Sequence, residues 1–147
     1  MTNPKGTYGE TGFVNTFHRL GDPSARRVVK AGSTDMGDVS LFEDEWRGQS
    51  KWGHTAQNAS EEQIRKWLIA AEAQAKAAGK NHAVLLTHRK GVGVGRAELC
   101  WAHIRMRELY RLSGIHELPT HVRPWLLDHI VRFTVADFYR LVREAKP

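Results

Sequence analysis

The chain is poor in the residues that build disulfide frameworks and membrane spans. It contains one cysteine among 147 residues, which excludes an internal disulfide and any zinc module built from several cysteines. No stretch approaches the roughly 18 consecutive apolar residues that a transmembrane helix needs. The first ten residues, MTNPKGTYGE, contain no apolar run of the signal-peptide type. These absences predict one cytoplasmic domain over residues 1–147 with no membrane segment.

Basic residues outnumber acidic ones, and the excess lies in one part of the chain. Lysine and arginine total 22 against 16 aspartate and glutamate residues, for a formal net charge of +6. Residues 1–50 hold 6 basic and 7 acidic side chains, whereas residues 51–147 hold 16 and 9. A basic region beside a local acidic cluster suits a polyanion partner together with a divalent cation. A solvated surface with one charged turn explains the same charges.

Hydrophobic periodicity predicts an α/β domain with the element order αβββαββαβα and a mixed central sheet flanked by helices. The first helix is predicted from Thr7 to Gly21. The clearest helix begins at a capping box formed by Ser60 and Gln63 and ends at Gly79. The predicted strands are 26–31, 39–42, 47–52, 82–87, 98–102 and 129–134; the further helices are 104–112 and 135–144, with a polar loop at 53–59 and a C-terminal extension at 115–147.

One predicted hairpin gathers side chains that suit metal chemistry. Pairing through the turn at 43–45 brings Asp38 close to Gln49, Ser50 and Lys51. Gln49 and Lys51 share a face of their strand, while Ser50 offers its backbone carbonyl. A carboxylate, an amide oxygen and a main-chain carbonyl are the ligands that Mg²⁺ prefers, and Mn²⁺ accepts the same set. Lys51 could then act on water and phosphate. A hairpin in which Asp38 starts a turn and Lys51 lies along the surface explains the same residues.

Glu10 allows two interpretations. It shares the buried stripe of the first helix with Phe13 and Val14, where an acid is unusual unless it meets a cation. Thr7 and Glu10 also have capping-box spacing, in which Glu10 would bind only the backbone of Thr7.

Four segments then follow one another in a known order: Lys5-Gly6-Thr7-Tyr8-Gly9-Glu10, RVVKAGS at 27–33, Gly37-Asp38-Val39 and Gln49-Ser50-Lys51. In this order they resemble the Holliday junction resolvases of the PD-(D/E)XK nuclease superfamily, of the archaeal type that some phages also carry. The resemblance covers roughly residues 5–90. It implies a restriction-endonuclease-like core in which Glu10, Asp38 and Gln49 hold the metal and Lys51 serves the water and the phosphate.

The chain departs from that pattern at Gln49, where most relatives have glutamate. Gln-x-Lys resembles variants among restriction endonucleases of the same superfamily, so activity remains compatible with it, although the lost charge should weaken metal binding. Glu45-x-Arg47 is a rival register that falls in or beside the turn, and Asp35 is a rival for Asp38.

A glycine-rich segment at 91–95 lacks the lysine of a Walker loop and the third glycine of a dinucleotide fingerprint, so no nucleotide cofactor is predicted. We expect a flexible hairpin whose flanking side chains grip a phosphate backbone. The predicted DNA-binding residues are Lys5, Arg27, Lys30, Ser33, His88, Arg89, Lys90 and Arg96.

These observations together predict a Mg²⁺-dependent endodeoxyribonuclease that resolves four-way junctions by phosphodiester hydrolysis. Two symmetric incisions call for a C2 homodimer on branched DNA, and the resemblance allows a phage-encoded protein in a bacterial host. Two alternatives stay open: a restriction- or repair-type nuclease of the same fold with another DNA substrate, and a DNA-binding module whose nuclease site has decayed.

Overall fold

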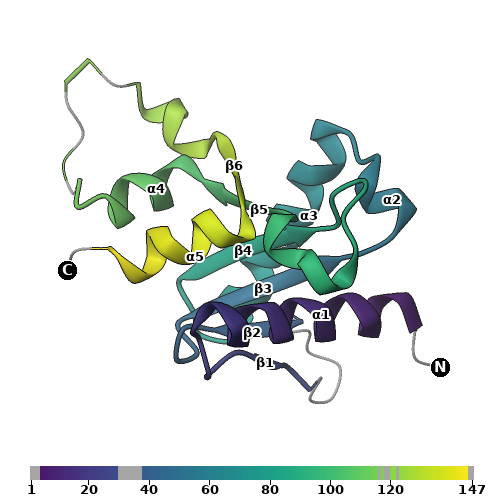
Figure 1. Cartoon of the computed structure of the whole chain (residues 1–147). Coiled ribbons are helices and arrows are strands. Elements are labelled where there is room, and N and C mark those ends of the chain that lie inside the picture. Colours follow the sequence, from purple (N-terminus) through teal and green to yellow (C-terminus); the bar gives the residue numbers. More distant parts are fainter. Residues whose placement is uncertain (1–3, 30–37, 116, 118–119, 122, 146–147) are drawn as a thin grey trace.

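The computed structural model describes residues 4–29, 38–115, 117, 120–121 and 123–145. In these residues six strands form one mixed sheet with helices on both faces (Figure 1). The predicted α/β class with a mixed, helix-flanked sheet is therefore confirmed.

The elements follow the predicted order with three short helices added, α2 and the two 3-10 helices η1 and η2. In chain order they are α1 (Pro4–Leu20), β1 (Arg26–Arg27), β2 (Val39–Leu41), β3 (Trp46–Lys51), α2 (His54–Gln57), α3 (Glu61–Ala77), β4 (His82–Thr87), the 3-10 helix η1 (Val94–Leu99), β5 (Trp101–Arg105), α4 (Met106–Leu112), the 3-10 helix η2 (Pro124–Asp128), β6 (Ile130–Thr134) and α5 (Val135–Arg143).

Strand order in the sheet equals sequence order, from β1 to β6. The first three strands form an antiparallel meander, α2 and α3 make the crossover to β4, which runs parallel to β3, and β5 and β6 return antiparallel. β3 and β4 thus occupy the middle of the sheet, where a continuous apolar strand such as HAVLLT is expected.

One face of the sheet is covered by α1, α5 and η1 (Figure 1), and it carries the larger core. Its side chains are large and aromatic, and those that are at most 2% exposed include Phe13, Phe17, Phe42, Trp46 and Phe138. Helix α1 lies so close to the sheet that a Cβ placed on Gly9 would stand 2.5 Å from Cβ of Trp52. Glycine at this position is what allows the close approach.

The opposite face is covered by α3 and has a smaller core of Leu68, Ala71, Ala75, Ala83 and Leu85. Ser60 caps α3 as predicted, because its Oγ accepts a hydrogen bond from the Gln63 N–H at 3.1 Å. Gly79 follows the helix with φ +74°, the left-handed conformation that ends helices. The sequence pattern therefore predicted both ends of this helix correctly.

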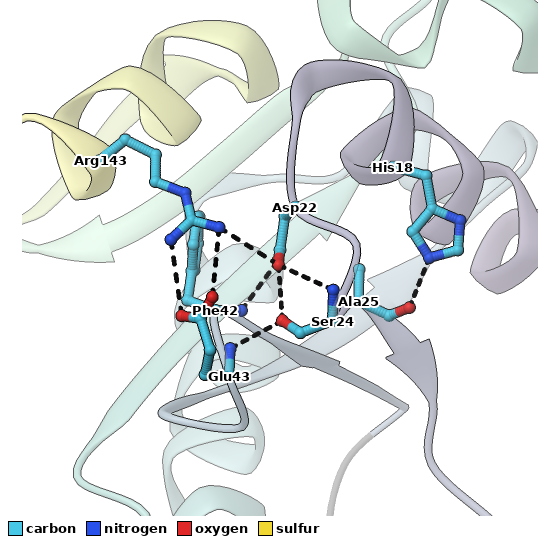
Figure 2. Close-up of polar contacts among 7 residues, drawn as sticks. All are labelled: His18, Asp22, Ser24, Ala25, Phe42, Glu43 and Arg143. Carbon is cyan, nitrogen blue, oxygen red and sulfur yellow. Dashed lines mark hydrogen bonds and ion pairs between the residues drawn. The ribbon is translucent and has the colours of Figure 1, made fainter.

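The turn between β2 and β3 is built from three consecutive non-glycine residues with positive φ, namely Phe42, Glu43 and Asp44. Such angles are costly for L-residues, and Figure 2 shows the contacts that hold them. Asp22, which is fully buried, accepts hydrogen bonds from the Phe42 N–H at 2.8 Å and from the Ser24 hydroxyl at 2.5 Å. Ser24 Oγ in turn accepts from the Glu43 N–H at 2.7 Å.

Helix α5 closes this cluster through Arg143, which lies 3.4 Å from Asp22 and 3.5 Å from Glu43 (Figure 2). Asp22 therefore holds the strained turn to the C-terminal helix and to the segment that follows α1.

Several predicted boundaries were wrong. Helix α1 begins at Pro4, three residues before Thr7, and α2 occupies part of the predicted polar loop. The strand predicted at 98–102 lies at Trp101–Arg105, because residues 94–99 form a 3-10 helix that buries Ala97 against the larger core. β1 spans two residues, and the part of its predicted range at 30–31 lies outside the described residues. Among the helices that the structure describes, none combines the length and apolar character needed to cross a membrane.

Candidate functional site

Asp38 and the Gln49–Lys51 segment lie together, as the hairpin predicted. Val39 pairs with Gly48 across β2 and β3, so Asp38 stands beside Gln49. The Asp38 carboxylate accepts a hydrogen bond from the Ser50 N–H at 2.9 Å, and the Asp38 N–H donates to the Gly48 carbonyl at 3.0 Å. These two bonds fix the carboxylate at the end of the β2–β3 hairpin ladder.

The Gln49 side chain is buried on the α3 face, and one of its polar atoms lacks a hydrogen-bond partner among the described residues. It is 8% exposed, and its register partner in β4 is Leu85, part of the smaller core. Its Oε1 has no donor among the described residues. A buried acceptor left unsatisfied costs about 1–3 kcal/mol. An amide oxygen in this position next to a carboxylate is available to a cation or to a donor from a ligand.

Ser50 presents different groups to different sides. Its hydroxyl is buried on the α1 face, 3.2 Å from where a Cβ on Gly9 would stand, and has no hydrogen-bond partner among the described residues. The Gly48 carbonyl points toward β2, where it accepts from Asp38. Carbonyls two residues apart in a strand point the same way, so the Ser50 carbonyl is directed toward the Asp38 side of β3.

Lys51 stands on the same face as Gln49. Its Nζ lies 5.4 Å from the centre of the Trp67 ring, a cation–π distance, and within the described part of the chain it forms no ion pair. An aromatic ring of α3 therefore orients the ammonium group, and no carboxylate of the described residues neutralises it.

Glu10 meets a cation, but within the chain itself. Because α1 begins at Pro4, Thr7 is inside the helix and the capping-box interpretation is wrong. The Glu10 Oε2 lies 3.1 Å from Nε of Arg27, and the Glu10 side chain is 19% exposed. Arg27 pairs with Val39 in the sheet, so this ion pair is one residue away from Asp38. Arg27 therefore stands between Glu10, with which it forms an ion pair, and the strand that follows Asp38. The sequence predicted that Arg27 contacts DNA.

In the described ranges no three side chains of histidine, cysteine, aspartate or glutamate form a group that could hold a metal ion. The Asp38 carboxylate binds the Ser50 N–H, so it lies beside the segment of β3 that carries the Gln49 amide and the Ser50 carbonyl.

The rival register at Glu45 and Arg47 has a structural role. Arg47 is buried and lies 2.9 Å from Asp44, which also accepts from Ser40 at 2.5 Å and pairs with Lys80 at 3.1 Å. Burial opposes ionisation of Asp44, but hydrogen bonds from Ser40 and Lys80 and the charge of Arg47 hold its pKa below the usual range. Glu45 is exposed in the turn.

Contacts of His88 hold the start of the glycine-rich loop in place, whereas the basic side chains that flank its glycines are exposed. His88 stacks on Trp52 with ring centres 3.6 Å apart; its Nδ1 accepts from the Gly53 N–H at 3.2 Å and its Nε2 donates to the Val92 carbonyl at 2.6 Å. His88 therefore shapes the loop, while Lys90 and Arg96 are exposed. β4 and β5 pair antiparallel across this loop, as a hairpin requires, but the residues that directly follow the glycines form η1 and not a strand.

Of the remaining predicted DNA-binding residues, one lies in a described helix and two lie outside the described residues. Lys5 lies in the first turn of α1. Lys30 and Ser33, like the rival metal ligand Asp35, fall outside the described residues.

Sequence reasoning missed a polar cluster on β4 to β6. His103 is buried and its Nε2 is 2.9 Å from Thr87 Oγ1; burial lowers the pKa of His103 to about 4, and the charge of Arg132 acts in the same direction. Trp101 carries two guanidinium groups over its ring, from Arg89 at 4.2 Å and Arg132 at 3.9 Å. Alternation along β5 would have placed Trp101 and His103 on one face, but the strand was predicted three residues too early.

Comparison of the chain with protein-family models, with curated proteins and with solved structures finds no match.

Proposed function

We propose that the chain is a Mg²⁺-dependent DNA endonuclease of the PD-(D/E)XK type that resolves four-way junctions. The observation that carries the proposal is the buried Gln49 Oε1, which has no hydrogen-bond partner among the described residues and belongs to the residue before Ser50, whose N–H binds the Asp38 carboxylate. Native proteins rarely keep such an acceptor unless an ordered water, an ion or a ligand satisfies it.

The positions of the motifs support the same function. The acid of the first segment, Glu10, stands on α1; the Asp38 carboxylate directly precedes β2; and Gln49 and Lys51 stand on the next strand. An acid on the first helix, an Asp-led strand and an x-x-Lys motif on the next strand follow one another in the order that the family resemblance implies.

The donor set fits a hard divalent ion. Asp38, Gln49 and the Ser50 carbonyl would hold it through three oxygens of different charge. A bound Mg²⁺ would acidify a water molecule and stabilise negative charge on phosphate. Lys51, which has no carboxylate partner in the described chain, would bind a phosphate oxygen or orient the attacking water.

Charge supports a DNA substrate. The excess of basic residues lies beyond residue 50, and exposed Lys90 and Arg96 follow the strand beside Lys51. Cleavage of a junction requires two related incisions, so the active form would be a C2 dimer with one site from each protomer.

The test is a titration of cleavage against Mg²⁺, on a synthetic four-way junction beside a linear duplex. Gln49→Glu should lower the Mg²⁺ concentration for half-maximal cleavage, because it adds a charge at the ion, and Gln49→Ala should raise it. Lys51→Ala should lower the maximal rate and leave the Mg²⁺ dependence unchanged. Lys66→Ala, an exposed lysine of α3, is the matched control and should equal wild type. Equal Mg²⁺ dependence in wild type and both Gln49 variants would refute a metal site at residue 49.

The Glu10–Arg27 ion pair favours a second candidate, a DNA-binding module without cleavage. In that case the acid that the family uses at the metal is neutralised within the chain. The two candidates differ in one measurement: a binding module retains junction binding in EDTA, shows no cleavage with Mg²⁺ or Mn²⁺, and is unaffected by Asp38→Asn.

A further inference from the structure

A row of cations crosses the sheet from the candidate site, on the face that α3 covers in part. Lys51 of β3 pairs with Thr87, and Thr87 pairs with Trp101 of β5. Side chains of paired residues share a face, so Lys51, Thr87 and Trp101 line one end of the sheet on the α3 side.

Arginines from two further segments reach this row. Arg89, after β4, and Arg132, on β6, both lie over the Trp101 ring. Neither forms an ion pair with a carboxylate among the residues that the structure describes. Both guanidinium groups are held about 4 Å from the same ring centre, so two positive charges lie close together, which suits an anionic ligand such as a phosphate.

The row opens into a groove on the same face. The groove encloses about 740 Å³ between the first turns of α3, the edge strands and η2, and its lining includes His103, Arg132, Arg65 and Trp125. Arg65 also lacks a carboxylate partner in the described chain. Of the two acids in the lining, Asp128 is already paired with Arg107 and only Glu61 is uncommitted.

Trp125 gives the groove a stacking surface. Its side chain is 62% exposed, the most exposed aromatic side chain among the large exposed hydrophobics of the described residues. It lies at the groove wall beside His129, with ring centres 5.2 Å apart. Exposed aromatic rings next to arginines that lack acidic partners are the elements with which proteins bind unpaired bases and the phosphates between them.

We infer that this face binds a single-stranded segment of DNA. Its phosphates contact Arg89 and Arg132, and an unpaired base stacks on Trp125. The inference rests on the proposed function only in taking DNA as the nucleic acid. It adds a substrate class, DNA with unpaired nucleotides next to the duplex, and predicts that a junction opened near its centre is bound more tightly than a fully paired one.

The binding test uses fluorescence anisotropy of a labelled oligothymidylate, in EDTA, at several salt concentrations. A second probe is an oligonucleotide of equal length whose internal sites are abasic. Trp125→Ala should weaken oligothymidylate binding about tenfold, within the range for loss of one stacked base, and leave abasic binding unchanged. Arg132→Gln should weaken both probes and reduce the magnitude of the log–log salt slope by about 0.7.

The matched control is Arg140→Gln, on the exposed side of α5 across the sheet. It removes the same charge and should leave both probes near the wild-type affinity. Equal losses in Arg132→Gln and Arg140→Gln, or equal loss of both probes in Trp125→Ala, would overturn the inference. Thermal unfolding of each variant checks that the fold is intact.

The result is separable from that of the proposed function. Base-dependent binding in EDTA without Mg²⁺-dependent cleavage would support the groove and refute the nuclease. Mg²⁺-dependent cleavage without base-dependent binding would support the nuclease and refute the groove as a site for single-stranded DNA.

Discussion

The two faces of the sheet are built from different chemistry. The α1 face buries aromatic rings that meet edge to face, such as Phe17 against Phe42 at 5.9 Å and Trp46 against Phe138 at 5.2 Å. The α3 face buries alanine and leucine, and among them the polar groups of Gln49 and His103. The first face supplies most of the apolar burial that stabilises the fold, and the second retains polar groups that only ligands or specific hydrogen bonds can satisfy. Stability and candidate chemistry are thus separated by one layer of backbone.

The largest loss of stability should come from truncating a buried aromatic side chain on the α1 face. Phe17→Ala removes a fully buried ring that contacts Phe42 and Phe138, and it should cost about 3–5 kcal/mol of unfolding free energy in urea. Leu68→Ala makes the corresponding deletion on the α3 face, where small neighbours leave less to lose, and should cost about 2–3 kcal/mol. A Phe17→Ala loss no larger than that of Leu68→Ala would contradict the comparison.

Acid should destabilise the α3 face through His103. Unfolded His103 takes up a proton near its ordinary pKa, whereas the folded imidazole stays neutral until its pKa of about 4. The unfolded state therefore binds more protons in this window, and stability falls as the pH drops from about 6.5 to 4, by about 3 kcal/mol in total. Urea unfolding at pH 7 and at pH 4.5 measures the loss.

His103→Gln provides the control for this pH effect. It should flatten that part of the pH dependence, because glutamine does not titrate. An identical pH profile in both proteins would assign the effect to other groups.

Gln49 and Ser50 are neighbours whose side chains lie on opposite faces of the sheet, so substitutions at these two positions compare the faces directly. Gln49→Leu removes an unsatisfied amide from the α3 face and should raise stability by about 1 kcal/mol. Under the proposed function Mg²⁺ should raise the melting temperature of the wild type, and Gln49→Leu should abolish that rise. Ser50→Ala removes an unsatisfied hydroxyl from the α1 face but keeps the carbonyl, so the Mg²⁺ effect should persist. Loss of the Mg²⁺ effect in both variants, or in neither, would show that Gln49 is not the ligand.

The smallest loss of stability is expected where α5 contacts the turn between β2 and β3. Arg143→Gln breaks ion pairs of 3.4 and 3.5 Å from a side chain that is 33% exposed, and it should cost at most about 1 kcal/mol. Part of that loss should disappear at high salt. Arg140→Gln, whose pair with Glu144 is more exposed, should cost less still. Equal values for the two would mean that Asp22 holds the turn without help from Arg143.

Local patterns predicted much of the fold. The N-cap at Ser60, the helix end at Gly79 and the strand at His82–Thr87 depend on near neighbours, and each was confirmed. The closeness of Asp38 to Gln49 was also confirmed, because a short hairpin fixes its own register.

Contacts between distant segments were not predictable in this way. The Glu10–Arg27 pair, the Thr87–His103 bond and the Arg143 contacts join residues separated by 17, 16 and 100 or more positions. The 3-10 helix at Val94–Leu99 likewise forms because Ala97 packs into the larger core and Val94 against Gly12, not from local propensity.

The sequence by itself determined the α/β class, the central strands and the pairing of Asp38 with the Gln49–Lys51 segment, because periodicity and turn chemistry act over a few residues. The tertiary structure alone decided which polar groups find partners. It satisfied Asp22 and Asp44, paired Glu10 with Arg27, left Gln49 Oε1 without a donor among the described residues, and brought Arg89 and Arg132 onto Trp101. The physical reason is that satisfaction of a buried polar atom depends on what the packing of distant elements places within hydrogen-bond distance.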